Sequence, residues 1–121
     1  MDFGTQAGVA VGLFALGVFL LVFRLMTRGG GDRSAEVRVA LEAGAVVVDV
    51  RSPGEFAQGH VAGAVNLPVD QLPARLAELP PDRMVVVYCA SGMRSARAAA
   101  LLRGAGRTVV DAGTAASFPA G

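Results

Sequence analysis

The feature that most restricts how this chain folds is a run of 20 residues without a charged side chain, Gly4 to Phe23. At about 1.5 Å per residue, a helix of that length spans the roughly 30 Å hydrocarbon core of a bilayer. A buried core helix would need another domain's worth of chain to cover its faces. A cleaved signal peptide would need basic residues before the apolar run, where the chain has only Asp2, and a cleavage site after it. We therefore predict a transmembrane helix over residues 4–23.

The charges beside this span predict its orientation. Arg24, Arg28 and Arg33 follow the span, and no basic residue precedes it in the sequence. Cytoplasmic flanks of membrane helices are enriched in arginine and lysine. We therefore expect a single-pass protein of the cell membrane whose C-terminal part lies in the cytoplasm.

Glycines within the span leave two interpretations open. Gly4, Gly8 and Gly12 follow the small-xxx-small spacing that lets two membrane helices approach closely. A chain with 16 glycines also produces such spacing by chance. A helix-mediated homodimer is therefore one interpretation, and coincidence is the other.

The rest of the chain predicts a linker and one α/β domain. Residues 24–33 hold arginines and three consecutive glycines, typical of a flexible linker. In residues 34–121, strand-like apolar runs alternate with helical periodicity, which predicts a mostly parallel sheet with helices on both faces. The pattern fades after Asp111. The predicted helices cover 35–43, 53–58, 70–79 and 95–103, and the predicted strands cover 45–50, 64–67, 84–88 and 108–110.

Composition excludes several function classes. The formal net charge of +1 lacks the basic excess of a nucleic-acid-binding protein. A single cysteine excludes an intramolecular disulfide and a cysteine-rich zinc site, and a single histidine removes most other metal arrangements. We predict no metal site. The lone Cys89 is therefore either inert or central to the function.

Two predicted strands end in residues that can form a site. One strand runs out at Asp49 and Arg51, and the other at Cys89. Ligands of parallel sheets bind at the carboxyl ends of the strands, so both segments point to one crevice. The residues after Cys89 form a short loop that contains Gly92 and leads into a helix. Amides and a helix N-terminus there would lower the pKa of the thiol, and Arg94 adds a cation. The alternative is a buried structural cysteine.

Three segments resemble the single-domain rhodaneses in order and spacing. These are residues 49–56 (DVRSPGEF), 59–68 (GHVAGAVNLP) and 85–95 (VVVYCASGMRS), within a resemblance that covers about 34–111. The resemblance implies a rhodanese-like α/β fold and a sulfurtransferase in which Cys89 carries a persulfide. It implies no organic cofactor, a sulfane-sulfur donor such as thiosulfate, and an external thiol or cyanide as acceptor. The residues expected to bind substrate are Ala90, Ser91, Gly92, Met93 and Arg94.

The length of the loop after the cysteine distinguishes this family from other activities on the same fold. Rhodanese-like phosphatases and arsenate reductases carry a loop similar to C-x5-R, which has room for a tetrahedral oxyanion. Here four residues separate Cys89 from Arg94, which favours a pocket the size of a sulfur atom. A non-catalytic binding or sensing module at the membrane remains an alternative.

The remaining polar positions of the motifs have structural interpretations. His60 is expected to be a hydrogen-bonded turn or core residue, and Asp49 to shape the crevice or to pair with Arg51. Glu55 is expected to anchor its helix to a neighbouring backbone or arginine. Ser95 is expected to cap the helix after the loop, and Tyr88 to pack within its strand.

Overall fold

The computed structural model describes residues 17–21 and 32–120. Residues 17–21 are helical, but most of the helix predicted over 4–23, its three spaced glycines and linker residues 24–31 lie outside the described residues. Within the described ranges, no helix is long and apolar enough to cross a membrane. The chain divides into two compact units, residues 1–31 and 32–121, and the second contains the sheet.

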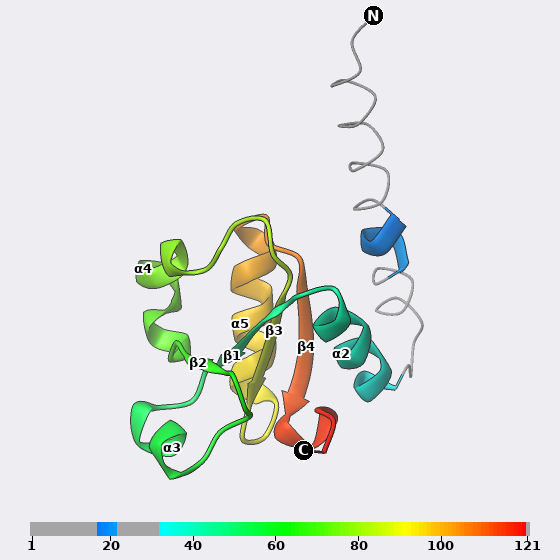
Figure 1. The fold of residues 1–121 in the computed structure, drawn as a ribbon. Coiled ribbons are helices and arrows are strands. Elements are labelled where there is room, and N and C mark those ends of the chain that lie inside the picture. Colours follow the sequence, from blue (N-terminus) through cyan, green and yellow to red (C-terminus); the bar gives the residue numbers. More distant parts are fainter. Residues whose placement is uncertain (1–16, 22–31, 121) are drawn as a thin grey trace, which may run out of the picture. The chain divides into compact units, whose positions relative to one another are not determined.

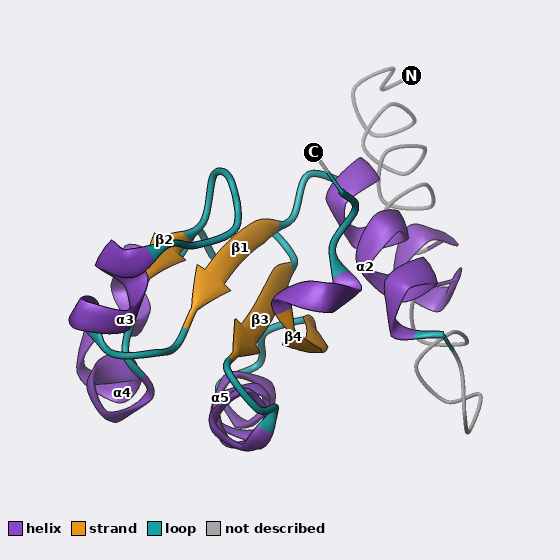
Figure 2. Ribbon diagram, turned by 90° about the horizontal axis from the view of Figure 1, so that it is seen from below, coloured by secondary structure: helices purple, strands orange, loops and turns teal. Residues whose placement is uncertain are grey.

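Four parallel strands form one sheet in the order β2-β1-β3-β4 (Figure 1). Helix α2 packs against β3 and β4 on one face, and α5 packs against the same strands on the other (Figure 2). The predicted parallel sheet with helices on both faces is therefore confirmed. The strands are β1 (Val46–Asp49), β2 (Val65–Asn66), β3 (Val85–Cys89) and β4 (Val109–Thr114), and the main helices are α2 (Arg33–Glu42), α3 (Pro53–Gln58), α4 (Leu72–Arg75) and α5 (Met93–Gly104).

The position of β3 inside the sheet, between β1 and β4, explains why its sequence is apolar throughout. All five of its residues are buried, because each face of the sheet is covered. Alternate side chains of a strand point to opposite faces. Val85, Val87 and Cys89 accordingly belong to the core cluster that contains Leu102 of α5, whereas Tyr88 points to the other face. Cys89 is the last residue of β3 and lies at the carboxyl edge of the sheet.

The helix predicted over 70–79 is wrong as one continuous element. The segment consists of a 3-10 turn (Val69–Gln71), the short α4 and a second 3-10 turn (Leu76–Glu78). Pro73 lies in the first turn of α4, the part of a helix where a missing backbone N–H is tolerated. That restriction prevents α4 from extending backwards as a regular helix.

Two boundaries near the predicted site also differ from expectation. Helix α5 begins at Met93 with Gly92 as its N-cap, so the prediction that Ser95 caps this helix is wrong. Strand β4 continues past Asp111 to Thr114, and a 3-10 turn follows at Ala115–Ser117. Pairing with β3 orders this segment, although its small residues carry little local signal.

Candidate active site

The loop after β3 surrounds the sulfur of Cys89 with backbone N–H groups. Cys89 Sγ accepts hydrogen bonds from the amides of Gly92 (3.0 Å) and Ser95 (3.3 Å). Gly92 adopts a left-handed backbone with φ +93°, which a glycine reaches without a steric cost. That turn directs its N–H back at the sulfur. The loop is therefore shaped to hold a charged sulfur atom.

The electrostatics of this loop favour the thiolate. Burial alone raises the pKa of the Cys89 thiol, because the side chain is only 2% exposed. Hydrogen bonds from the backbone N–H groups of Ser95, Gly92 and Ser91 outweigh burial, and the pKa lies below that of an ordinary cysteine. A thiolate is the nucleophilic form of cysteine. The loop therefore favours the form of Cys89 that can act as a nucleophile.

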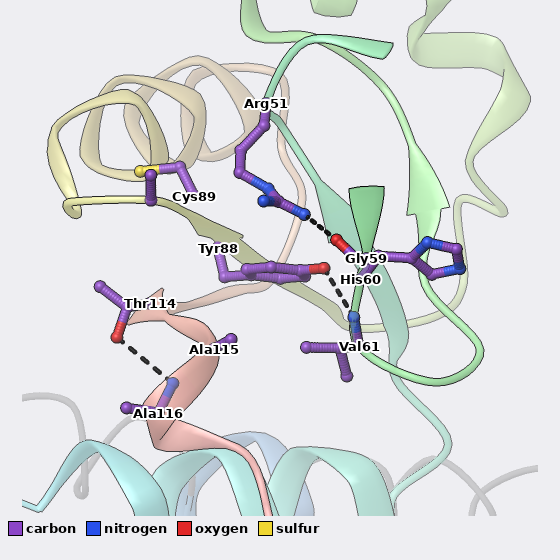
Figure 3. A pocket seen from close by; sticks show the side chains of 10 residues that line it. Arg51, Gly59, His60, Val61, Tyr88, Cys89, Thr114, Ala115 and Ala116 are labelled. Atoms are coloured by element: carbon purple, nitrogen blue, oxygen red, sulfur yellow. Dashed lines mark hydrogen bonds between the residues drawn. The ribbon is translucent and has the colours of Figure 1, made fainter. Parts of the chain in front are cut away.

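Cys89 lines a pocket of about 460 Å³ at the carboxyl edge of the sheet (Figure 3). Its walls come from four stretches of the chain: three lie at the ends of β1, β3 and β4 or just after them, and the fourth follows α3. The lining residues are Arg51, Gly59, His60, Val61, Tyr88, Cys89, Ala90, Thr114, Ala115 and Ala116.

A buried ionic network supports one wall of this pocket. Asp49 is fully buried, and both of its oxygens accept from Nε of Arg51 at 3.0 Å. Oδ2 also accepts from Nη2 of Arg51 at 2.6 Å and from the Tyr88 hydroxyl at 2.8 Å. Burial alone raises the pKa of Asp49, but these bonds outweigh it and keep the pKa below its usual value. The expected pairing of Asp49 with Arg51 is confirmed.

The network reaches the segment after α3. The Tyr88 hydroxyl accepts from the backbone N–H of Val61 at 2.9 Å, and Nη2 of Arg51 donates to the Gly59 carbonyl at 2.7 Å (Figure 3). Tyr88 therefore does more than pack within its strand. It links β3, β1 and residues 59–61 into one rigid wall.

The five residues expected to bind substrate occupy different environments. Ala90 lines the pocket, whereas Ser91 and Gly92 present their backbone N–H groups to Cys89. Met93 is 79% exposed and does not line the pocket. Arg94 also lies outside the lining residues. Their roles toward a substrate remain predictions.

Arg94 is engaged by Glu55. Nη1 and Nη2 of Arg94 donate to the two carboxylate oxygens of Glu55, at 2.7 and 3.0 Å. The Arg94 side chain and the Ser52 backbone N–H lower the pKa of Glu55 to about 2. Glu55 also forms the capping box of α3 with Ser52. The expectation that Glu55 anchors its helix to a neighbouring backbone or arginine is confirmed, and the structure shows both contacts.

His60 is held by its own turn, as expected. Its ring stacks on Phe56 with centroids 3.7 Å apart, and Nδ1 lies 2.9 Å from the Phe56 carbonyl oxygen. The ring is exposed and borders the pocket. Among the residues that the structure describes, no cluster of His, Cys, Asp or Glu could hold a metal ion.

Thr114, Ala115 and Ala116 form a wall of the pocket that was not predicted from the sequence. In the register of β3 and β4, Val87 pairs with Asp111 and Tyr88 with Gly113, so Ala112 forms a bulge. The bulge and the turn after it bring residues 114–116 to the edge where Cys89 lies. The predicted parallel sheet was the available signal for this wall, because all strands of such a sheet end at the same edge and the residue after the last strand should lie near Cys89.

The fold and this site define an α/β protein with a cysteine sulfur held by loop amides at the carboxyl edge of a parallel sheet. The family model of the rhodanese-like domain matches residues 34–115. The chain belongs to the rhodanese-like family.

Relatives of known name point to sulfur chemistry. The chain is 44% identical over 80 residues to the "Sulfurtransferase" of Allochromatium vinosum, covering 64% of this chain and 75% of that protein. It is 39% identical over 66 residues to "Thiosulfate sulfurtransferase PspE" of Escherichia coli, covering 53% of this chain and 64% of that protein. The match thus spans less than two thirds of the second relative.

A solved structure shares the fold. The structure titled "rhodanese with anions from E. coli" is 35% identical with a TM-score of 0.57, and the match covers 61% of this chain and 93% of that one. The sulfurtransferase relatives and this structure support a rhodanese-like enzyme.

Proposed function

We propose that this protein transfers sulfane sulfur through a persulfide on Cys89. The thiolate attacks the outer sulfur of a donor such as thiosulfate. A new S–S bond forms at Cys89, the S–S bond of the donor breaks, and sulfite leaves with the electron pair of that bond. The observation that carries this proposal is the ring of N–H groups around Sγ, which stabilises negative charge at the sulfur.

The second half-reaction needs an external acceptor. Cys89 is the one cysteine of the sequence, so no second thiol of this chain can take the sulfur. A low-molecular-weight thiol, a protein thiol or cyanide attacks the outer sulfur of the persulfide and releases the Cys89 thiolate. With cyanide the product is thiocyanate, which gives a direct assay.

A mass measurement on the protein tests the proposal. After incubation with thiosulfate, we expect the intact protein to gain the mass of one sulfur atom and to lose it on addition of cyanide. Cys89→Ser should abolish both the added mass and thiocyanate production while leaving the circular dichroism spectrum unchanged. An aryl phosphate serves as the control substrate, for which we expect little hydrolysis.

Three results would contradict the proposal. Sulfur transfer by folded Cys89→Ser at near-normal rate would exclude Cys89 as the carrier. A wild-type protein that never acquires the added sulfur would instead favour a non-catalytic module, and faster phosphate hydrolysis would favour a phosphatase.

We also propose that residues 4–23 anchor the protein in the cell membrane with the rhodanese-like domain in the cytoplasm. The proposal is supported by the uncharged run and by the arginines that follow it. A reporter that works only in the cytoplasm should be active when fused after Gly121, and activity of a reporter that works only outside would reverse the orientation. Pairing of two such helices along Gly4, Gly8 and Gly12 is testable by crosslinking in membranes.

A further inference from the structure

Arg51 is the one permanently charged side chain among the residues that line the Cys89 pocket, within the part of the chain that the structure describes. Arg94, the other cation near the loop, is held by Glu55 and lies outside the lining. A small anion that enters this pocket therefore meets the guanidinium of Arg51 rather than that of Arg94.

The hydrogen bonds of Arg51 leave one of its nitrogens for a ligand. A guanidinium carries five N–H donors. Nε donates to Asp49, and Nη2 donates to Asp49 and to the Gly59 carbonyl. Nη1, with two N–H groups, has no acceptor among the described residues. Figure 3 shows the guanidinium between Cys89 and Gly59, beside the ring of Tyr88.

The guanidinium is fixed in this position. Its Cζ lies 5.7 Å from the centroid of the Tyr88 ring, and Asp49 holds two of its nitrogens from behind. The side chain therefore loses little further freedom when it binds a ligand, which favours affinity. A rigid, planar fork of N–H groups also matches the oxygens of a sulfonate-like group.

The proposed reaction creates a need for such a cation. An anionic donor such as thiosulfate is repelled by the Cys89 thiolate that must attack it. The amides of Gly92 and Ser95 already bind Sγ and offset the charge of the thiolate only. Asp49 already balances the charge of Arg51, but the two N–H groups of Nη1 can donate charge-assisted hydrogen bonds to the oxygens of the donor, and the same contact accepts the sulfite that leaves.

We propose that Arg51, through Nη1, binds the oxyanion group of the sulfur donor and makes the Cys89 pocket selective for anionic donors. The inference rests on the sulfurtransferase function proposed above. It assigns to Arg51 the contact with the negatively charged oxygen group of such a donor. Asp49 and Tyr88 are positioning residues for Arg51.

A pair of alkylating reagents tests the charge preference without sulfur transfer. Iodoacetate and iodoacetamide have similar size and differ in charge, and both alkylate a thiolate. With the full-length protein at one fixed pH, we expect the ratio of the iodoacetate rate to the iodoacetamide rate at Cys89 to exceed that of free cysteine. The expected excess is about tenfold, the factor that one charge-assisted hydrogen bond supplies. Inorganic sulfate should slow the alkylation by iodoacetamide.

Three variants locate the cation. The double variant Asp49→Asn/Arg51→Gln removes both charges together, so no buried carboxylate is left unpaired, and should return the ratio to that of free cysteine. Arg97→Gln removes one positive charge from an exposed arginine on α5, a change of net charge that the double variant does not make, and should leave the ratio high. Arg94→Gln tests the competing assignment, and we expect its ratio to stay high.

The outcomes separate this inference from the proposed function. A wild-type ratio no higher than that of free cysteine overturns the anion site, and this measurement requires no variant. A fall of equal size in Arg97→Gln overturns the specific contact in favour of net charge, and a fall only in Arg94→Gln overturns the assignment to Arg51. If the ratio is high but thiosulfate leaves no persulfide, the anion site stands and the sulfurtransferase function fails.

Discussion

A thiol as buried as that of Cys89 would ordinarily stay protonated, because burial disfavours the charged form. Here the backbone reverses that tendency, since the loop directs the N–H groups of Ser91, Gly92 and Ser95 at one sulfur atom. Backbone N–H groups remain whatever side chains the loop carries. The reactivity of Cys89 therefore depends on the path of the loop more than on its side chains.

The first prediction concerns how the reactivity of Cys89 depends on pH. Because the folded loop lowers the pKa of the thiol, the thiolate forms at a lower pH than in free cysteine, whose pKa is about 8.5. The rate of alkylation by neutral iodoacetamide should therefore reach half its plateau at a pH below that of free cysteine. The protein in denaturant provides the control and should titrate like free cysteine. A half-plateau pH equal to or above that of free cysteine would mean that burial dominates.

The second prediction concerns the Tyr88 hydroxyl. Tyr88→Phe keeps the ring and its edge contact with Phe118 but leaves the N–H of Val61 without its partner and removes one bond to Asp49. Loss of such buried bonds should lower the free energy of unfolding by about 1–3 kcal/mol, measured by urea denaturation. Thr114→Val removes a hydroxyl whose hydrogen bond is exposed and should cost much less. Equal losses in the two variants would show that the Tyr88 network stabilises the fold no more than an exposed hydrogen bond does.

For single residues, the sequence was informative where a role depends on neighbours along the chain. The place of Cys89 before a glycine-containing loop and a helix left two interpretations open, a reactive thiol and a buried structural cysteine, and the resemblance to the rhodaneses favoured the first. The partners of Tyr88 and Arg94 could not be predicted in the same way. Asp49 is 39 residues from Tyr88, and Glu55 is 39 residues from Arg94. Only the strand order brings these side chains together.

The connection from β3 to α5 depends on one backbone conformation. Gly92 is both the N-cap of α5 and a hydrogen-bond donor to Cys89 Sγ. Its φ of +93° is open to glycine and costs other residues about 1–2 kcal/mol. A side chain at Gly92 would meet only ordinary contact, 3.8 Å from the Gly113 Cα, so strain rather than space restricts this position.

The third prediction compares two glycines with similar backbone angles. Gly92→Ala and Gly44→Ala, the latter at φ +85° with open space around it, should each lower the free energy of unfolding by about 1 kcal/mol. Only Gly92→Ala should also shift the half-plateau pH of Cys89 alkylation upward, because the strained loop relaxes and moves one N–H away from the sulfur. Chemical denaturation and alkylation rates measure both effects. An unchanged alkylation profile in Gly92→Ala would remove the Gly92 amide from the causes of the low pKa.

Elements were predictable where a local pattern was strong. The valine-rich β1 and β3 and the Pro-started α3 lie within a residue or so of their predicted bounds. The single helix predicted over 70–79 was wrong because Pro73 restricts where a helix can begin. The predicted end of β4 was wrong because Ala112 and Gly113 have low strand propensity. Only their pairing with β3 holds them in the sheet.

The rhodanese-like unit contains its own core. The buried cluster draws on β1, β3, β4, α4 and α5, and each of its members lies within 48–109. α2, which covers the other face, begins at Arg33 and is capped by Asp32. All elements of this sheet and both of its covering layers thus come from residues 32–120.

The fourth prediction follows from that division of the chain. A fragment of residues 32–121 should fold and unfold cooperatively in urea, and its Cys89 should be alkylated with the same dependence on pH as in the full-length protein. A fragment that begins at 44, which lacks α2, provides the control and should fail to fold because one face of the sheet is bare. Failure of the 32–121 fragment to fold would show that the first 31 residues contribute to the core.

In the proposed sulfur transfer, the burial of Cys89 restricts the order in which the two substrates react. Loop amides cover one side of the sulfur, and with 2% of the residue exposed, donor and acceptor must approach from the pocket side in turn. The two substrates then compete for one entrance, and the first product must depart before the second substrate can react. Steady-state rates should follow ping-pong kinetics, with parallel lines in double-reciprocal plots. A high concentration of either substrate should inhibit, because each can occupy the enzyme form meant for the other.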